Sequence, residues 1–247
     1  MFLELPHPAI IGHRGASAHA PENTIAAFEL ALRQHADAIE LDTKLTVDGH
    51  VVVIHDQTVD RTTDGTGQVN KLSLKALKGL DAGSSFDISF KSEKIPTLEE
   101  VFETVGHKTC INIELTNYAT SLDDLPERVT ALIKKHNLQR TVLFSSFNAL
   151  TLLRVHKLLP DVPFGLLTLS KTGSFLANRW VNKIIPYNTL NPCFDDTNLR
   201  LVKRLHQRGR YVFVYTVNDP EAMRSLSAWG VDGFFTDDPG LAKHVLS

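Results

Sequence analysis

The sequence of 247 residues lacks several features that mark particular classes of protein. It has two cysteines, Cys110 and Cys193, which form neither a disulfide framework nor a zinc motif, so reduced thiols are expected. No apolar run approaches the ~20 residues that cross a bilayer. The first seven residues have neither the basic nor the apolar segment of a signal peptide. We therefore expect a cytoplasmic protein without stable membrane association.

Charge of one sign is not concentrated anywhere in the chain. Lysine and arginine number 26 against 28 aspartates and glutamates, and the formal net charge is -2 at pH 7. Binding to nucleic acid or to an anionic membrane surface usually requires a basic stripe or tail, and neither is present. We expect a small-molecule ligand and no nucleic acid partner, while the sequence leaves a homodimer open.

Short apolar runs alternate with amphipathic helical patterns along the whole chain. Eight runs are typical of strands, at 9–13, 38–44, 109–115, 141–147, 163–169, 184–189, 211–217 and 233–236. Helical patterns occupy 23–34, 98–105, 122–136, 149–158, 197–207 and 220–229. Continuously apolar strands indicate a parallel sheet covered by helices. Eight such units predict a single α/β domain, residues 1–247, folded as a (β/α)8 TIM barrel. The Gly-x-Gly-x-x-Gly opening of a dinucleotide-binding sheet is missing.

One connection is longer than the others. After the second run, Asp48-Gly49 is a strong hairpin signal, and the chain returns through residues 51–55 before a stretch rich in Gly, Ser and Asp. Loops of this length are usually functional when they are ordered. We interpret residues 45–95 as a small insertion that covers the mouth of the barrel.

Carboxylates interrupt two of the apolar runs. Glu40 and Asp42 are two residues apart, so they project from the same side of a strand, and Glu114 lies among aliphatic residues of the next run. Burying an unpaired carboxylate is costly, so either each acid has its own basic partner or the three share a cation. We favour one shared cation, because it explains why all three are acidic. Oxygen ligands select Mg²⁺, Ca²⁺ or Mn²⁺ over zinc.

Two histidines and an arginine also follow strands. His13 and Arg14 come after the first run, and His55 ends the return strand of the hairpin. Catalytic residues of such barrels lie at the carboxyl ends of strands. An imidazole titrates near pH ~6.5, so one histidine can donate a proton while the other accepts one, as displacement at phosphorus requires. The guanidinium of Arg14 matches two phosphate oxygens.

The start of the last helix is a frequent phosphate site in barrels, but here it is acidic. Asp238 is predicted to cap this helix, with Pro239 as its first residue. Asp237 and Asp238 would repel a phosphate dianion. The phosphate is therefore expected on Arg14 and the cation.

The chain contains an ordered set of motifs, which are His13-Arg14-Gly15, Pro21-Glu22-Asn23-Thr24, Ile39-Glu40-Leu41-Asp42, Asp48-Gly49, His55-Asp56, the run 61–67, Asn112-Ile113-Glu114, Ser145-Ser146-Phe147 and Thr216-Val217-Asn218. In order and spacing this set resembles the glycerophosphodiester phosphodiesterase family over nearly the whole chain.

The resemblance implies a function and a role for each matching residue. Members of this family hydrolyse glycerophosphocholine or glycerophosphoethanolamine to sn-glycerol 3-phosphate and an alcohol. By this likeness, His13 and His55 are the acid and base, and Arg14 is the phosphate ligand. The carboxylates that would bind Mg²⁺ or Ca²⁺ are Glu40, Asp42 and Glu114. Asn23 is expected to be only the N-cap of the first helix.

The sequence departs from the family pattern at two positions. Thr116 stands where the family usually has Lys, which removes one cation from the phosphate neighbourhood. Tyr215 replaces the usual Trp and still provides an apolar wall with a polar tip. Together with Phe147 and Arg14, these two residues are expected to contact the substrate.

Two other functions remain open from the sequence. A related lyase would use a neighbouring hydroxyl of the substrate as nucleophile and release a cyclic phosphate. A non-catalytic relative would bind phosphate without cleaving it, although it would have no need for both histidines and all three acids.

Overall fold

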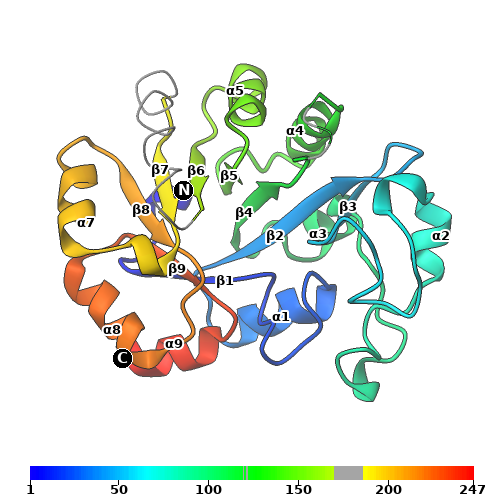
Figure 1. Cartoon of the computed structure of the whole chain (residues 1–247), viewed down its shortest axis with the longest axis horizontal. Helices are drawn as coiled ribbons and strands as arrows, with labels where there is room; N and C mark the ends of the chain where they lie inside the picture. The colour runs from blue at the N-terminus through cyan, green and yellow to red at the C-terminus, as the bar shows by residue number, and fades with distance from the viewer. Residues whose placement is uncertain (119, 121, 170–185) are drawn as a thin grey trace.

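Eight parallel strands close into a barrel, which confirms the predicted fold class (Figure 1). The computed structural model describes residues 1–118, 120, 122–169 and 186–247. Strand β1 pairs with both β9 and β2, and this double pairing closes the sheet. The barrel strands are β1 (Ala9–Gly12), β2 (Ala38–Leu45), β4 (Cys110–Leu115), β5 (Val142–Ser146), β6 (Phe164–Thr168), β7 (Thr189–Pro192), β8 (Tyr211–Val214) and β9 (Gly233–Thr236).

Helices form an outer layer around the strands (Figure 1). They are α1 (Ile25–Arg33), α3 (Leu98–Val105), α4 (Leu125–Lys135), α5 (Ala149–Leu158), α7 (Leu199–His206), α8 (Pro220–Trp229) and α9 (Pro239–Leu246). The side chain of Asp238 accepts a hydrogen bond from the amide of Leu241, and Pro239 is the first residue of α9. The predicted cap of the last helix is therefore confirmed.

One predicted strand was placed too early. The apolar run 184–189 predicted a strand, but residues 184 and 185 lie outside the described part of the chain and β7 begins only at Thr189. This strand includes Asn191 and Pro192, residue types that are depleted in strands. The hydrophobic pattern therefore gave no signal for its second half.

The alternation of side chains along each strand separates two kinds of environment. On β2, Ile39 and Leu41 pack outward against the helices, whereas Ala38 packs with the inner cluster of the barrel. Phe2, Ile11, Leu143, Phe213 and Phe235 belong to that inner cluster. Because residues two apart share a face, Glu40 and Asp42 continue the inward row that begins with Ala38. The interior of the barrel is thus apolar at the level of Ala38 and becomes polar toward the carboxyl end of β2, at Glu40 and Asp42.

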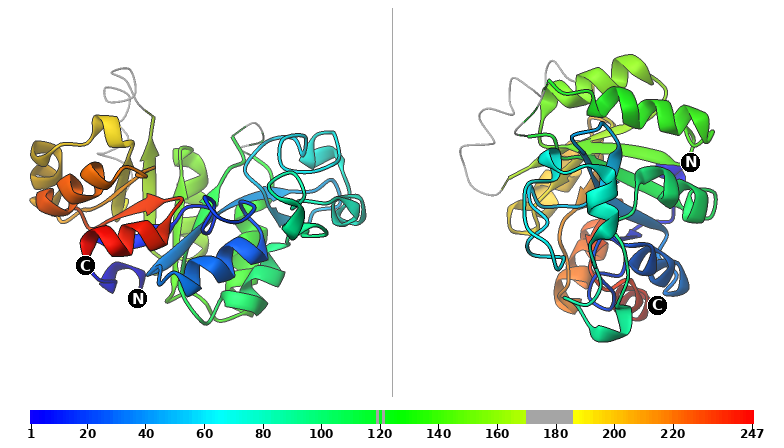
Figure 2. Two further views of the ribbon diagram at one scale, coloured as in Figure 1. Left: turned by 90° about the horizontal axis from the view of Figure 1, so that it is seen from below. Right: turned by 90° about the vertical axis from the view of Figure 1, so that its right-hand side faces the viewer.

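The segment between β2 and α3 forms a small unit with a core of its own (Figures 1 and 2). Strand β3 (Val51–Val53) runs antiparallel to β2, as the hairpin signal predicted, and the short helix α2 (Leu74–Gly79) follows. Its core consists of Val52, Ile54, Val59, Val69, Leu77, Ala82 and Ile95. In both figures this unit, coloured cyan to green, lies to one side of the barrel.

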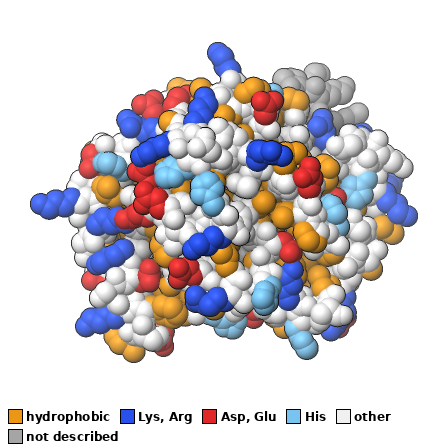
Figure 3. All heavy atoms as spheres, turned by 180° about the vertical axis from the view of Figure 1, so that it is seen from behind, with side chains coloured by type: hydrophobic (Ala, Val, Ile, Leu, Met, Phe, Trp, Pro, Cys, Tyr) orange, Lys and Arg blue, Asp and Glu red, His pale blue; other side chains and the backbone are white. Residues whose placement is uncertain are grey.

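Three further features concern the surface charges, the helices and the cysteines. On the face shown in Figure 3, basic and acidic side chains are interspersed, and neither sign forms a continuous block. None of the helices in the described part of the chain is long and apolar enough to cross a membrane. Both cysteines are free.

A sharp turn after β1 brings the chain back against α1. Gly15 has φ +86°, and a Cβ atom added there would lie 2.6 Å from the carbonyl carbon of Ala27. Real Cβ atoms do not approach backbone so closely, so only glycine fits. This turn fixes the backbone that carries His13 and Arg14.

We expect Gly15→Ala to destabilise the protein far more than Gly209→Ala. Both glycines have positive φ, but an added Cβ at Gly209 meets nothing within 4 Å. The control should lose only about 1 kcal/mol through backbone strain. The collision at Gly15 should cost roughly 3 kcal/mol or more. Urea denaturation would measure both free energies of unfolding, and equal losses would show that the close approach to α1 is not a constraint.

Candidate active site

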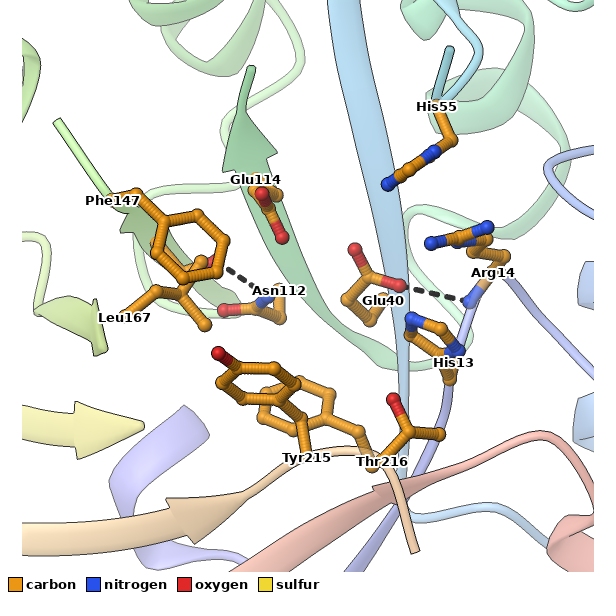
Figure 4. Close-up of a pocket in the computed structure, with 12 residues that line it drawn as sticks. His13, Arg14, Glu40, His55, Asn112, Glu114, Phe147, Leu167, Tyr215 and Thr216 are labelled. Carbon is orange, nitrogen blue, oxygen red and sulfur yellow. Dashed lines mark hydrogen bonds between the residues drawn. The ribbon is translucent and has the colours of Figure 1, made fainter. Parts of the chain in front are cut away.

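A cavity of about 190 Å³ opens at the carboxyl end of the barrel strands (Figure 4). Charged and imidazole side chains surround one end of it, and aromatic and aliphatic side chains form the other. The described residues that line it are His13, Arg14, Glu40, His55, Asn112, Glu114, Ser145, Phe147, Leu167, Tyr215, Thr216 and Phe235. The structure thus places in one cavity both predicted histidines, Arg14 and two of the three predicted carboxylates.

The register between β2 and β4 brings the three carboxylates together. Asp42 lies directly opposite Glu114, and Glu40 lies opposite Asn112. One oxygen from each of the three acids lies within 4.8 Å of the other two. Glu40 and Asp42 are almost completely buried, at 3% and 1% exposure. The predicted convergence of Glu40, Asp42 and Glu114 is therefore present in the structure.

This cluster has the chemistry of a site for a hard divalent cation. Its donors are all carboxylate oxygens, which suit Mg²⁺, Ca²⁺ or Mn²⁺. Oε1 of Glu40 is buried and has no hydrogen-bond partner among the described residues. A buried, unpaired carboxylate oxygen beside two other acids is a position that a cation would satisfy. The residues present therefore fit a metal ion.

Burial and mutual repulsion raise the pKa of two of these acids. The pKa of Glu40 is well above its ordinary value, because the group is buried and because Asp42 and Glu114 are close. Burial, followed by the charge of Asp42, raises the pKa of Glu114 to about 8. The hydroxyl of Tyr118 donates a hydrogen bond to Glu114 and opposes this shift. The cluster is therefore poorly suited to remain fully ionised without a cation.

Each histidine of the cavity is held by its own carboxylate. Nδ1 of His13 lies 2.6 Å from Oδ1 of Asp237, and Nδ1 of His55 lies 2.6 Å from Oδ1 of Asp56. A carboxylate can only accept, so both Nδ1 atoms carry the hydrogen. In Figure 4 the other ring nitrogen of each histidine faces the cavity. Both imidazoles thus present a nitrogen that can exchange a proton with a bound molecule.

Asp237 and Asp56 were not among the predicted site residues. The sequence predicts only that Asp237 repels phosphate. In the structure Ser17, Asn218 and His13 all bind its carboxylate. The hydrogen bond from His13 is the largest influence that lowers its pKa, which falls to about 2 despite partial burial. The available signal was the position of Asp237 directly after β9, because the ends of β9 and β1 are neighbours in a closed barrel.

Arg14 connects the acids to the insertion through a chain of ion pairs. Its backbone amide donates to Oε2 of Glu40 at 2.8 Å, and its guanidinium lies 3.3 Å from Asp42 and 3.0 Å from Glu22. Arg61 makes two hydrogen bonds to the same Glu22, of 2.7 and 2.8 Å, and one of 2.6 Å to Asp56. The network therefore continues from Asp42 to the carboxylate that holds His55.

The role predicted for Asn23 was wrong. Thr24, and not Asn23, caps α1, because its side chain accepts the hydrogen bond from the amide of Ala27. Asn23 has φ +59°, and its amide group both donates to the carboxylate of Asp42 and accepts from the Asp42 backbone. This left-handed conformation turns the side chain toward β2. Asn23 belongs to the site because it orients one of the three acids.

Thr116 is not among the described residues that line the cavity. It is buried directly after β4, where its hydroxyl donates to the carbonyl of Thr43 and accepts from the amine of Lys44 at 2.8 Å. Burial lowers the pKa of Lys44, while Asp42 and Glu114 act in the opposite direction. A lysine from β2 therefore supplies positive charge beside the acids. Its sequence signal was its spacing, two residues after Asp42.

The aromatic end of the cavity consists of rings that meet at steep angles. Phe147 packs edge to face with Tyr215 at 6.0 Å and with Tyr118 at 5.7 Å. The hydroxyl of Tyr215 donates to the carbonyl of Thr168 at 2.7 Å, which fixes its ring. Phe147 and Tyr215, both expected to contact the substrate, thus form a wall opposite the charged residues (Figure 4).

The family model and two relatives that match this chain have the same named activity. A profile of the Glycerophosphoryl diester phosphodiesterase family matches residues 13–241. The chain is 42% identical over 232 residues to a protein of Caldanaerobacter subterraneus named glycerophosphodiester phosphodiesterase, covering 93% of this chain and 94% of that one. A Bacillus subtilis protein of the same name is 35% identical, with 95% and 85% covered.

Solved structures give the same result. A phosphodiesterase of Oleispira antarctica, determined with the product sn-glycerol-3-phosphate, superposes with a TM-score of 0.90 at 30% identity and covers 97% of each chain. A glycerophosphodiester phosphodiesterase of Agrobacterium tumefaciens has a TM-score of 0.83 at 30% identity, with 96% of this chain and 99% of that one covered.

The raised pKa of Glu114 predicts how stability depends on pH. A carboxyl group with a higher pKa in the folded chain binds its proton more tightly there than in the unfolded chain. Its contribution is therefore present at low pH and is lost as the pH rises from about 5 to about 8. With EDTA present, the free energy of unfolding of Glu114→Gln should fall less over this range than that of the wild type. Parallel declines in urea denaturation would contradict the assignment.

Proposed function

The chain belongs to the glycerophosphoryl diester phosphodiesterase family and is an enzyme that cleaves glycerophosphodiesters, and we propose that it does so with a divalent cation, two histidines and Arg14. The products are sn-glycerol 3-phosphate and an alcohol, and glycerophosphocholine and glycerophosphoethanolamine are the expected substrates. The chain acts as one domain, in which the insertion 45–95 contributes His55.

One observation carries this proposal. Two histidines with fixed orientation face a single cavity that is also lined by Arg14 and by two members of the acidic cluster, Glu40 and Glu114. Neither a structural barrel nor a simple anion-binding protein needs two imidazoles that are each held by a carboxylate. Hydrolysis of a diester needs both, because one proton must leave the attacking water and one must reach the departing alcohol.

Arg14 binds the phosphate, and the acidic cluster beside it would hold a cation. Glu40, Asp42 and Glu114 are the residues that would bind Mg²⁺, Ca²⁺ or Mn²⁺. When bound there, the cation supplies positive charge next to the phosphate oxygens. Arg14 is oriented by Glu22 and Asp42, so its guanidinium is fixed before the substrate arrives.

The histidines move the protons. One ring nitrogen accepts the proton of the attacking water while the new P–O bond forms. The other histidine begins protonated on both ring nitrogens and donates the proton of its cavity-facing nitrogen to the alcohol oxygen as the old P–O bond breaks. Asp237 and Asp56 stabilise whichever imidazole becomes positively charged, because each carboxylate lies 2.6 Å from a ring nitrogen.

The proposal is supported by the relative from Oleispira antarctica, which was determined with sn-glycerol-3-phosphate. A lyase that releases a cyclic phosphate would use the same residues with a substrate hydroxyl as nucleophile. Phosphorus NMR of the reaction with glycerophosphocholine separates the two, since hydrolysis gives only the acyclic monoester.

We expect thorough chelation to abolish activity. Purified protein should release glycerol 3-phosphate from glycerophosphocholine, should stop when EDTA is added in excess, and should recover with Mg²⁺, Ca²⁺ or Mn²⁺. The physical reason is that three carboxylates without a cation repel the phosphate. Full activity after dialysis against EDTA would eliminate the cation from the proposal.

Loss of either cavity histidine should chiefly lower kcat. His13→Ala and His55→Ala are each expected to reduce kcat by roughly 10²–10⁴, the usual contribution of a general acid or base. His206→Ala is the matched control. His206 is the last residue of α7 and lies outside the cavity, and its Nε2 is 2.8 Å from Oδ2 of Asp232, so it forms a similar pair with a carboxylate. Wild-type turnover in both cavity variants would refute the proton-transfer roles.

A further inference from the structure

A buried polar atom at the floor of the cavity has no partner. Asn112 is 1% exposed, and its Nδ2 donates to Oγ of Ser145 at 2.8 Å. Its Oδ1 accepts no hydrogen bond from any described residue. Buried carbonyl oxygens are rarely left without a donor, so an unpaired one that borders a binding cavity indicates a ligand atom.

The position of Asn112 follows from the same strand geometry as the acids. It lies two residues before Glu114 on β4, so both side chains project into the barrel, Asn112 one layer deeper. In Figure 4 its oxygen points away from Glu40 and toward the end formed by Leu167 and Tyr215. The free acceptor therefore faces the part of the cavity that is otherwise apolar.

The surroundings define which donor would fit. Phe147, Leu167, Tyr215 and Phe235 offer ring faces and methyl groups to this end of the cavity. The hydroxyl hydrogen of Tyr215 is already given to Thr168. A fragment that suits this end needs an apolar carbon backbone and at least one hydroxyl. An esterified glycerol has both, whereas the trimethylammonium group of choline has no hydrogen to donate.

A second hollow leaves room for the rest of the substrate. It adjoins the first and shares His13 and Arg14 with it, while Ser17, Asn218 and Asp237 line its other side. A diester whose phosphorus lies beside His13 and Arg14 can therefore extend one arm toward Asn112 and the other into this hollow. The aromatic end, which contains the free acceptor, suits the arm with a hydroxyl, and glycerol is the arm that all glycerophosphodiesters share.

We propose that Oδ1 of Asn112 accepts a hydrogen bond from a hydroxyl of the glycerol moiety, so that this residue selects diesters containing glycerol. The inference rests on the proposed function, because it concerns the same cavity and the same phosphate position. Asn112 is thus a binding residue that determines which of the two ester arms enters the aromatic end.

The test compares substrates with and without the glycerol hydroxyls. Asn112→Leu preserves side-chain volume but removes the acceptor. We expect its kcat/KM for glycerophosphocholine to fall about tenfold, mainly through KM, as loss of one hydrogen bond predicts. Its kcat/KM for propylphosphocholine, which lacks both hydroxyls, should change less than about twofold. Asn191→Leu is the matched control, because Asn191 is equally buried on β7 but outside the cavity, and it should affect both substrates equally.

Binding measurements separate this inference from the proposed function. In calorimetry with Mg²⁺, the wild type should bind sn-glycerol 3-phosphate about tenfold more tightly than propyl phosphate, and Asn112→Leu should bind the two alike. This comparison is informative even if the wild type hydrolyses no diester, a result that would reject the proposed function alone. Equal affinity of the wild type for both ligands would overturn the role of Asn112. An equal loss of kcat/KM for glycerophosphocholine and propylphosphocholine, in either Asn112→Leu or Asn112→Ala, would also overturn it.

Discussion

Repulsion among three clustered carboxylates, two of them fully buried, is the constraint around which this end of the barrel is built. Hydrogen bonding between β2 and β4 fixes their register, and this register places Asp42 opposite Glu114, with Glu40 one layer below. The backbone therefore enforces a proximity that the side chains themselves oppose. Acidic side chains on a flexible surface loop could move apart, but these three cannot separate without breaking the sheet.

The surrounding residues reduce that repulsion in different ways. The backbone amide of Arg14 binds one oxygen of Glu40, and the Arg14 guanidinium and the amide of Asn23 both face Asp42. Lys44 adds a buried positive charge beside the cluster. These contacts leave one oxygen of Glu40 without a partner, and the pKa of Glu114 still rises to about 8. The protein groups thus compensate incompletely, and a divalent cation bound at this cluster would complete the compensation and place positive charge beside the phosphate.

Much of this arrangement could be predicted because it depends on simple periodicity. Alternation along strands identified the inward acids, and the order of strands and helices identified the barrel. The partners Asp237 and Asp56, by contrast, depend on which strand ends are neighbours and on how loops turn. Asn23 was misassigned because its left-handed backbone conformation has no signal in the residue types around it. Thr116 carried no indication that Lys44 would bind it, since that contact depends on the register of two strands.

The position of the cation is the claim that can be examined most directly. Crystals grown without chelator and soaked in Mn²⁺ would be measured at a wavelength where manganese scatters anomalously. One strong anomalous peak is expected, bounded by oxygens of Glu40, Asp42 and Glu114. A second acidic group among the described residues, at Glu99, Glu103 and His136, should stay empty, because Lys135 already binds Glu99. A peak only at that second group, or none between β2 and β4, would contradict a cation site on Glu40, Asp42 and Glu114.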